Sequence, residues 1–236
     1  MKILAIDTSS KICSVSILED TNVLIEKHSD DEKTHSQKLM PIIDSVFKEV
    51  NLSLDNIDLL ACSQGPGSFT GIRIGISTVK AFSDVKHIPV IGVTSLESLA
   101  YNIKTGGLVA TLIDAKHDNV YFALFELKAG NCTTIIEPVS DCITNVVSQL
   151  KEYSCKITFI GDGSVVHKEL LQKDFQNCDF ATDVENLQTS ISIGKSAFNK
   201  YNSKNYEPSY TLSPIYLKKS QAEINLENSK INNTVN

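Results

Sequence analysis

An order of predicted elements that occurs twice along the 236-residue chain constrains its fold most. In each half, three short apolar strands separated by polar turns precede a helix, a further strand and a further helix. The first strand of each half ends on the same pair, Ile6-Asp7 and Ile113-Asp114, and the fourth strand runs into a glycine turn, Gly65-Pro66-Gly67 and Gly161-Asp162-Gly163. Two matches this short arise by chance often enough that the element order is the stronger evidence. Together they predict an internal duplication.

A duplication with an aspartate at the end of each first strand resembles the actin, sugar-kinase and Hsp70 (ASKHA) superfamily, in which the ligand lies between two lobes. We therefore expect an α/β fold with two lobes, each with a mixed sheet in the order β-β-β-α-β-α and flanking helices. The expected lobes cover residues 1–105 and 106–219. Residues 220–236 are polar and rich in asparagine without a sustained period, which indicates a mobile tail.

Charge and hydropathy exclude two classes of function. The 22 basic and 28 acidic residues give a net charge of −6, whereas a surface that binds nucleic acid by itself needs clustered Lys and Arg. The first apolar run meets Asp7 after four residues, and no later run approaches the roughly 20 residues of a membrane span. The six cysteines include no Cys-x-x-Cys pair. We expect a cytoplasmic protein that does not contact a membrane.

The stretch from Gly65 to Gly75 lies between a predicted strand and a predicted helix, where backbone N–H groups can face an anion. It lacks the lysine of a P-loop and the third glycine of a Rossmann motif, so on the loop alone a structural turn is favoured over a nucleotide site. The turn Asp7-Thr8-Ser9-Ser10 offers a carboxylate and three hydroxyls, which in ATP-binding members of the superfamily handle phosphates and Mg²⁺. The alternative is that Asp7 merely caps its own turn.

A vestigial nucleotide cleft built from these segments would use Asp7, Thr8, Ser9, Gly65, Gly67, Ser68 and Asp114. Asp114 is the counterpart of Asp7, but no second hydroxyl-rich loop follows it. The histidines form no His-x-x-x-His pair on a helix, so neither a metal site nor a cofactor is expected. A Gly-x-Ser-x-Gly hydrolase elbow is also missing, because the segment from Gly67 to Gly71 has one residue too many.

Two predicted helices suggest a protein partner. The apolar arc of the first, at about 35–50, is wider than the roughly 100° stripe with which a surface helix meets its own core. On the second, at about 71–83, Gly71 and Gly75 share one face and permit close approach of another helix. Ordinary burial against the sheet explains both helices equally well. The residues expected at an interface are His35, Leu39, Met40, Ile43, Phe47, Gly71, Ile72, Gly75, Val79 and Phe82.

Four motifs, in order from residue 1 to about 222, closely resemble the bacterial TsaB family, formerly called YeaZ. They are Ile3-Leu4-Ala5-Ile6-Asp7-Thr8-Ser9, His35-Ser36-Gln37-x-x-Met40-Pro41, the segment from Gly65 to Arg73, and Pro214-x-Tyr216-Leu217. The glycine motif is specific, whereas the others are weak individually. Lys218 stands where the family usually has arginine, which retains the charge but loses the planar fork.

The resemblance implies a noncatalytic partner that supports TsaD in transferring a threonylcarbamoyl group to the tRNA adenosine beside the anticodon. In this pathway TsaE is an associated ATPase, and tRNA would be met only indirectly, through the complex. Loss of catalysis is implied because the histidine pair with which TsaD-like proteins hold metal is replaced, His35 being followed by Ser36, Gln37, Lys38 and Leu39. A heterodimer through the helices of the first lobe is expected, and a homodimer of the free protein stays open.

Two enzymatic alternatives remain at this point. One is an ATP-dependent enzyme that uses Asp7 and the loop from Gly65 to Gly75. The other is a metallopeptidase, which the missing histidine pair makes the weakest of the three hypotheses.

Overall fold

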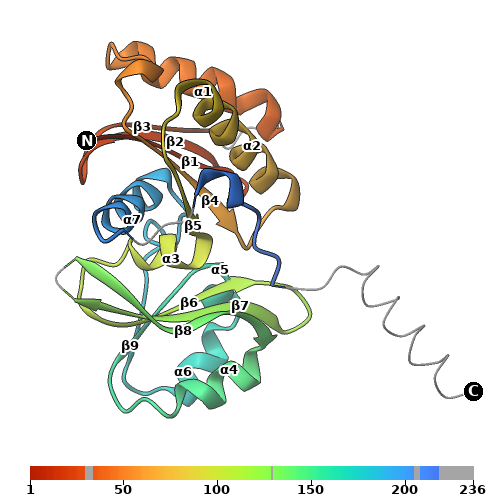
Figure 1. Cartoon of the computed structure of the whole chain (residues 1–236). Coiled ribbons are helices and arrows are strands. Elements are labelled where there is room, and N and C mark those ends of the chain that lie inside the picture. The colour runs from red at the N-terminus through yellow and green to blue at the C-terminus, as the bar shows by residue number, and fades with distance from the viewer. Residues whose placement is uncertain (30–33, 129, 205–207, 218–236) are drawn as a thin grey trace, which may run out of the picture.

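The computed structural model describes residues 1–29, 34–128, 130–204 and 208–217, so the predicted tail at 220–236 lies outside the described residues. Two five-stranded sheets lie one above the other with helices outside and between them (Figure 1). None of the helices in these ranges is long and apolar enough to cross a membrane.

The first sheet has the strand order β3-β2-β1-β4-β5. Strands β1 to β3 pair as antiparallel neighbours, and β4 and β5 continue the sheet in parallel with β1. The bounds are β1 Lys2–Asp7, β2 Cys13–Glu19, β3 Asn22–Ser29, β4 Leu59–Gly65 and β5 Val90–Thr94. The 3₁₀ turn η1 (Leu54–Asn56) precedes β4.

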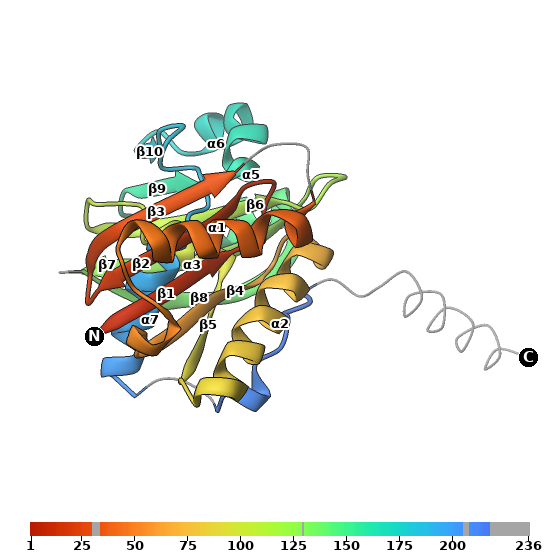
Figure 2. The same ribbon diagram turned by 90° about the horizontal axis from the view of Figure 1, so that it is seen from above.

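Three helices cover the first sheet. Helices α1 (His35–Glu49) and α2 (Phe69–Lys86) pack on its outer face, where Leu39, Ile43, Ile72 and Val79 join the strand residues in one buried cluster (Figure 2). Helix α7 (Ser190–Asn202) packs on the inner face. The 3₁₀ turn η2 (Ser209–Thr211) follows α7 and leads into the last described residues.

The second sheet repeats the plan, with the order β8-β7-β6-β9-β10 and the same pattern of antiparallel and parallel pairs. Its strands are β6 Gly107–Asp114, β7 Asn119–Lys128, β8 Asn131–Cys142, β9 Ile157–Ile160 and β10 Cys178–Phe180. Its outer helices are α4 Ile143–Leu150, α5 Asp162–Val166 and α6 Lys168–Asp174. The predicted duplication and the two-lobed α/β fold class are confirmed.

Each half contributes its last helix to the layer between the sheets. Helix α3 (Ser95–Ala100) follows the last strand of the first sheet but packs against the second sheet through Leu96 and Leu99. Conversely, α7 follows the second sheet and packs against the first through Ile193 and Ala197. This exchange joins the two lobes through a shared layer.

Two strands differ from the sequence expectation. Hydrophobic alternation predicts a third strand of the second half over 132–137, but β8 continues to Cys142 because its pairing with β7 extends past Pro138. A proline is tolerated there because β8 is an edge strand. Strand β10 was missed because its three residues are too few to show alternation.

Candidate functional site

The turn after β1 is closed to solvent. Asp7, Thr8 and Ser9 are 0%, 1% and 2% exposed. The backbone N–H and the hydroxyl of Ser9 both donate to Asp7 Oδ1, at 2.8 and 2.6 Å. Asp7 therefore caps its own turn, which is the second of the two interpretations that the sequence left open.

The glycine-rich loop fills the space above this turn. The N–H of Ser68 donates to Ser9 O at 2.7 Å, and the Thr8 hydroxyl donates to Gly71 O at 2.7 Å. A Cβ on Gly67 would lie 2.3 Å from Ser9 O, so only glycine allows this approach. Gly65 and Gly67 have φ of +91° and +156°, where side chains are disfavoured. The contacts of this loop are thus made within the chain.

The surroundings of Asp7 disfavour the ionised form of its carboxyl group. Burial raises the pKa of its carboxyl, and the two hydrogen bonds from Ser9 lower it by less. Asp7 Oδ2 has no hydrogen-bond partner in the described part of the chain. The Ser9 hydroxyl also lies 2.9 Å from Oε1 of Gln188, a residue in the segment that precedes α7. With no exposed surface, the Asp7 carboxylate cannot contact a Mg²⁺ ion or a phosphate in this conformation.

Asp114, the counterpart in the second lobe, has a different environment. Burial raises its pKa, but hydrogen bonds from the backbone and side chain of Lys116 outweigh that effect and lower it. Its own N–H donates to Asp162 Oδ1 at 2.9 Å. Within the described ranges, no hydrogen bond or ion pair joins Asp114 to the Asp7 turn. The carboxylates of Asp7 and Asp114, which were expected to share a cleft, therefore each bond to residues of their own turn.

His35 does not present a metal ligand. Its Nε2 lies 2.8 Å from Ser10 O, so the first residue of α1 is tied to the Asp7 turn. Among the residues that the structure describes, no group of three or more His, Cys, Asp or Glu side chains is placed to hold a metal ion.

Most of the residues expected at a partner interface lie in the protein's own core. Those that are buried are Leu39, Ile43, Gly71, Ile72, Gly75 and Val79. His35, Phe47 and Phe82 are half-buried, whereas Met40 is 51% exposed. For those six residues, the structure shows ordinary burial against the sheet of the same lobe.

Gly71 and Gly75 pack against the protein's own Thr8, contrary to the expectation that they admit a partner helix. A Cβ on Gly71 would lie 1.9 Å from Thr8 O, and one on Gly75 would lie 2.6 Å from Thr8 Oγ1. The glycine face of α2 is therefore occupied by the Asp7 turn of the same chain and is not available to a partner helix.

The exposed side of α2 was missed from the sequence. A shallow cavity of about 450 Å³ lies there, lined by Phe69, Thr70, Arg73, Ile74, Ser77 and Thr78. These residues recur every three or four positions and alternate with the buried Ile72, Ile76 and Val79, so a helical projection would have separated the two faces. Phe69 is 54% exposed, and Val85 at the far end of α2 is 73% exposed.

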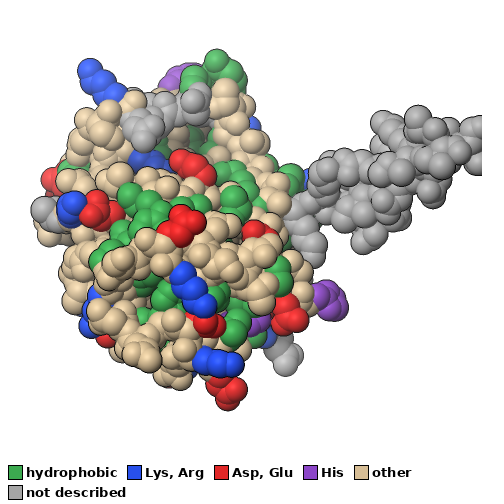
Figure 3. Space-filling model, turned by 90° about the horizontal axis from the view of Figure 1, so that it is seen from below, with side chains coloured by type: hydrophobic (Ala, Val, Ile, Leu, Met, Phe, Trp, Pro, Cys, Tyr) green, Lys and Arg blue, Asp and Glu red, His purple; other side chains and the backbone are tan. Residues whose placement is uncertain are grey.

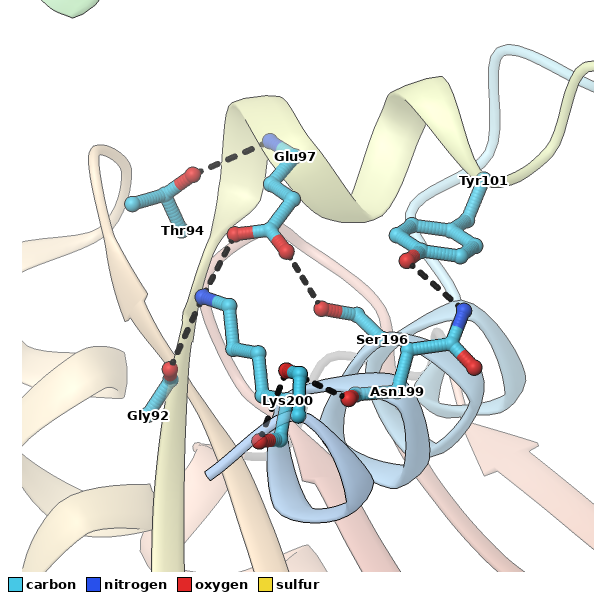
Figure 4. Close-up of polar contacts among 8 residues, drawn as sticks. Gly92, Thr94, Glu97, Tyr101, Ser196, Asn199 and Lys200 are labelled. Carbon is cyan, nitrogen blue, oxygen red and sulfur yellow. Dashed lines mark hydrogen bonds and ion pairs between the residues drawn. The ribbon is translucent and has the colours of Figure 1, made fainter. Parts of the chain in front are cut away.

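A second polar cluster joins α3 to α7 between the lobes (Figure 4). Glu97 accepts a hydrogen bond from Ser196 at 2.6 Å and pairs with Lys200 at 2.6 Å, and Asn199 donates to the Tyr101 hydroxyl at 3.1 Å. Burial raises the pKa of Tyr101 to about 12. A cavity of about 520 Å³ opens beside these groups. Glu97 and Lys200 neutralise each other's charge. Since α3 packs on the second sheet and α7 on the first, these contacts connect the two lobes.

Acidic and basic side chains are interspersed on the face of the molecule seen in Figure 3. Neither sign gathers into a single patch there. This face lacks the continuous basic area with which proteins hold an RNA backbone.

Comparisons with known proteins agree with the two-lobed fold. The family model described as "TsaD: tRNA N6-adenosine threonylcarbamoyltransferase" matches residues 26–226. The chain is 30% identical over 173 residues to the tRNA threonylcarbamoyladenosine biosynthesis protein TsaB of Bacillus subtilis, covering 73% of this chain and 76% of that protein.

Two solved structures extend the comparison. A Pseudomonas aeruginosa protein described as similar to peptidase YEAZ superposes with a TM-score of 0.78 at 24% identity, covering 92% of this chain and 99% of that one. The activator of 2-hydroxyisocaproyl-CoA dehydratase from Clostridium difficile, with bound ADPNP, superposes with a TM-score of 0.51 at 8% identity, covering 92% and 100%. Both likenesses, at under 25% identity, show the two-lobed ASKHA fold alone. From the family model, the Bacillus relative and the fold, the chain belongs to the TsaB (YeaZ) family of tRNA threonylcarbamoyladenosine biosynthesis proteins.

Proposed function

We propose that this protein is a noncatalytic partner that supports TsaD in transferring the threonylcarbamoyl group to a tRNA adenosine beside the anticodon. The observation that carries the proposal is the closed Asp7 turn. In an ATP-dependent enzyme of this fold, the carboxylate would have to reach Mg²⁺ or phosphate, yet Asp7 has no exposed surface. Instead, the Ser68 N–H donates to Ser9 O, the Thr8 hydroxyl donates to Gly71 O, and Gly67 lies close against the backbone of Ser9.

The outer face of the first lobe is the surface that we assign to TsaD. Helices α1 and α2 form the outermost layer of this lobe, as seen from above in Figure 2. They expose Met40, Phe69 and Val85, each by more than half of its surface. Exposed apolar and aromatic side chains on adjacent helices are typical of a surface that is covered in a complex. The interface is thus proposed on the exposed side of α2, with Met40 retained from the predicted set.

The remaining parts of the proposal follow from the same assignment. TsaE would join as an associated ATPase, and tRNA would be met through the complex rather than by this chain alone, in line with its net charge of −6. A homodimer of the free protein would cover the same helices and would compete with TsaD. The site of action is the cytoplasm, where tRNA is modified.

A reconstituted reaction tests the proposal. Purified TsaD, TsaE with ATP, an activated threonylcarbamoyl donor and substrate tRNA are assayed for threonylcarbamoyl transfer with and without this protein, and ATP hydrolysis by this protein alone is measured in parallel. We expect modification to depend on the protein and its own ATP turnover to be negligible. Robust ATP hydrolysis by the isolated chain that disappears in Asp7→Asn would instead support the ATP-dependent enzyme.

A further inference from the structure

Arg73 is the only arginine in the chain, since the other 21 of its 22 basic residues are lysines. Lysine and arginine carry the same charge, but only the guanidinium presents a planar fork of N–H donors that fits an oxyanion with two parallel hydrogen bonds. Arg73 is therefore the single position in the chain that can bind an oxyanion through this planar fork.

Two aromatic rings hold the Arg73 guanidinium in place. Its central carbon lies 3.8 Å from the centre of the Phe69 ring. Its Nε donates to the Tyr216 hydroxyl at 2.9 Å, and the rings of Phe69 and Tyr216 stack with centroids 5.3 Å apart. Phe69, Arg73 and Tyr216 are called the Arg73 cluster below. Among the described residues, nothing accepts a hydrogen bond from the two terminal nitrogens of Arg73.

The last described segment of the chain completes this cluster. The N–H of Ile215 donates to Gln64 O at 2.9 Å, and the Gln64 side chain donates to Ser213 O at 3.0 Å. These bonds fix the segment against the end of β4, so Tyr216 reaches a helix that lies 143 residues earlier in the chain. In Figure 1 the blue segment after α7 runs beside β4 and α2. Two motifs that are separate in the sequence, the glycine motif and Pro214-x-Tyr216-Leu217, thus meet at one place.

The cluster lies on the surface. Phe69 and Tyr216 are 54% and 52% exposed, and both Phe69 and Arg73 line the shallow cavity on the outer side of α2. Phenylalanine, tyrosine and arginine are enriched where protein interfaces are strongest. An oriented guanidinium between aromatic rings offers a strong, specific contact once a partner excludes water, because charge-assisted hydrogen bonds strengthen in a low dielectric.

We propose that the Arg73 cluster anchors the partner interface and that the guanidinium binds a carboxylate of the partner protein through paired hydrogen bonds. The inference rests on the proposed function, because the partner in question is TsaD. A protein carboxylate is favoured over an RNA phosphate because RNA binding needs several neighbouring cations. On α2, the basic residue next along from Arg73 is Lys80, two turns away, and it donates to Tyr210 O at 3.3 Å.

Variants that alter the fork but retain the charge test the proposal. The dissociation constant of the complex with purified TsaD is measured for wild type, Arg73→Lys, Tyr216→Phe and the control Lys80→Ala, each first checked for an unchanged melting temperature. We expect Arg73→Lys to weaken binding by about tenfold, because lysine retains the charge but loses the second parallel hydrogen bond and the stacking on Phe69. Tyr216→Phe should weaken it several-fold by releasing Nε, and Lys80→Ala should remain within about twofold of wild type.

The carboxylate is tested by charge exchange. Arg73→Glu should abolish the complex, and one TsaD variant from a set with each acidic residue changed to arginine should restore it. Failure of every TsaD variant to restore binding would overturn the carboxylate assignment.

Other results would overturn the anchor itself. One such result is an unchanged affinity for TsaD in Arg73→Lys. Another is a loss of affinity in Lys80→Ala as large as that in Arg73→Lys, which would indicate only a general charge effect. Loss of tRNA binding with unchanged TsaD affinity would assign the cluster to RNA. If wild type does not bind TsaD at all, the proposed function fails first, which distinguishes the two failures.

Discussion

The two lobes share one topology but differ in what their outer helices and their aspartate turns do. The first lobe has long outer helices, α1 with 15 residues and α2 with 18, whereas the outer helices α4, α5 and α6 of the second have 8, 5 and 7. The aspartate turn of the first lobe is sealed beneath α2, and that of the second keeps Asp114 paired with the exposed Lys116. The two lobes therefore share a strand order but differ in the length of their outer helices and in the environment of their aspartates.

The asymmetry is clearest in the two faces of α2. In the first lobe the glycine loop and the start of α2 pack directly onto the Asp7 turn. The same helix turns its other side outward and exposes Phe69 and Arg73. We infer that the helix seals the cleft with one face and offers the other to a partner.

The largest effect is expected from filling the space between α2 and the Asp7 turn. Gly71→Ala places a methyl group 1.9 Å from Thr8 O, and backbone atoms cannot yield as a flexible side chain would. Overpacking of this kind should lower the free energy of unfolding by about 3 kcal/mol, measured by urea denaturation.

Gly106→Ala in the second lobe is the matched control. A Cβ at Gly106 would meet only Leu127 O, at 3.1 Å, so its cost should be below about 1 kcal/mol. Equal losses in the two variants would show that the first lobe is not sealed as tightly as described.

The next effect is expected at the junction of the lobes. Lys200→Met leaves the mostly buried Glu97 without its cation, since the side chains of Lys200 and Glu97 are only 23% and 14% exposed. The free energy of unfolding should fall by about 2 kcal/mol. Lys48→Met, which breaks the exposed pair with Asp44, should cost less than about 0.5 kcal/mol. If thermal denaturation ranks the two variants in the opposite order, the network of Figure 4 does not connect the lobes as described.

The smallest effect distinguishes the two aspartate turns by its dependence on pH. The folded-state pKa of Asp7 is raised by burial, so folding becomes less favourable as pH rises and this carboxyl ionises. Asp7→Asn should therefore gain stability over wild type as pH rises above the ordinary range of an aspartate. His35 and Glu26, the charged or titratable groups acting on Asp7, are unchanged in this comparison.

Asp114→Asn should show the opposite sign. Hydrogen bonds from Lys116 lower the pKa of Asp114 despite its burial, so its carboxylate contributes stability above its unfolded-state pKa and loses it as pH falls. The variant should be less stable than wild type at neutral pH and approach it in acid, as followed by melting temperatures across the pH range. The same pH trend in both variants would contradict the contrast between the turns.

The sequence predicted the fold well because element order and hydrophobic alternation are local signals that the duplication repeats. It placed the glycine loop and the Asp7 turn side by side, but it could not tell that the loop would fill the space above the turn. That outcome depends on distances of a few ångströms between Gly67, Gly71 and the backbone of residues 8 and 9. The interface residues were chosen from the apolar stripe, which is the side of a helix most often buried in the protein itself.

Arg73 and Tyr216 could not be joined from the sequence, because 143 residues separate them and neither breaks a periodic pattern. The motifs that contain them were both recognised by resemblance, yet only folding shows that they form one cluster. The single arginine among 22 basic residues is a compositional signal that marks this position in the sequence.

The central claim, support of TsaD by an outer surface rather than by a catalytic cleft, is tested most directly by the rate of TsaD-dependent tRNA threonylcarbamoylation at saturating and limiting amounts of this protein. Three variants are compared with wild type: Asp7→Asn in the closed turn, Met40→Glu on α1, and Val184→Glu, a control on the 77% exposed residue of the segment before α7. The account predicts wild-type rates with Asp7→Asn and Val184→Glu, and a rate reduced at limiting protein with Met40→Glu. A rate that is lost with folded Asp7→Asn and retained with Met40→Glu would contradict it.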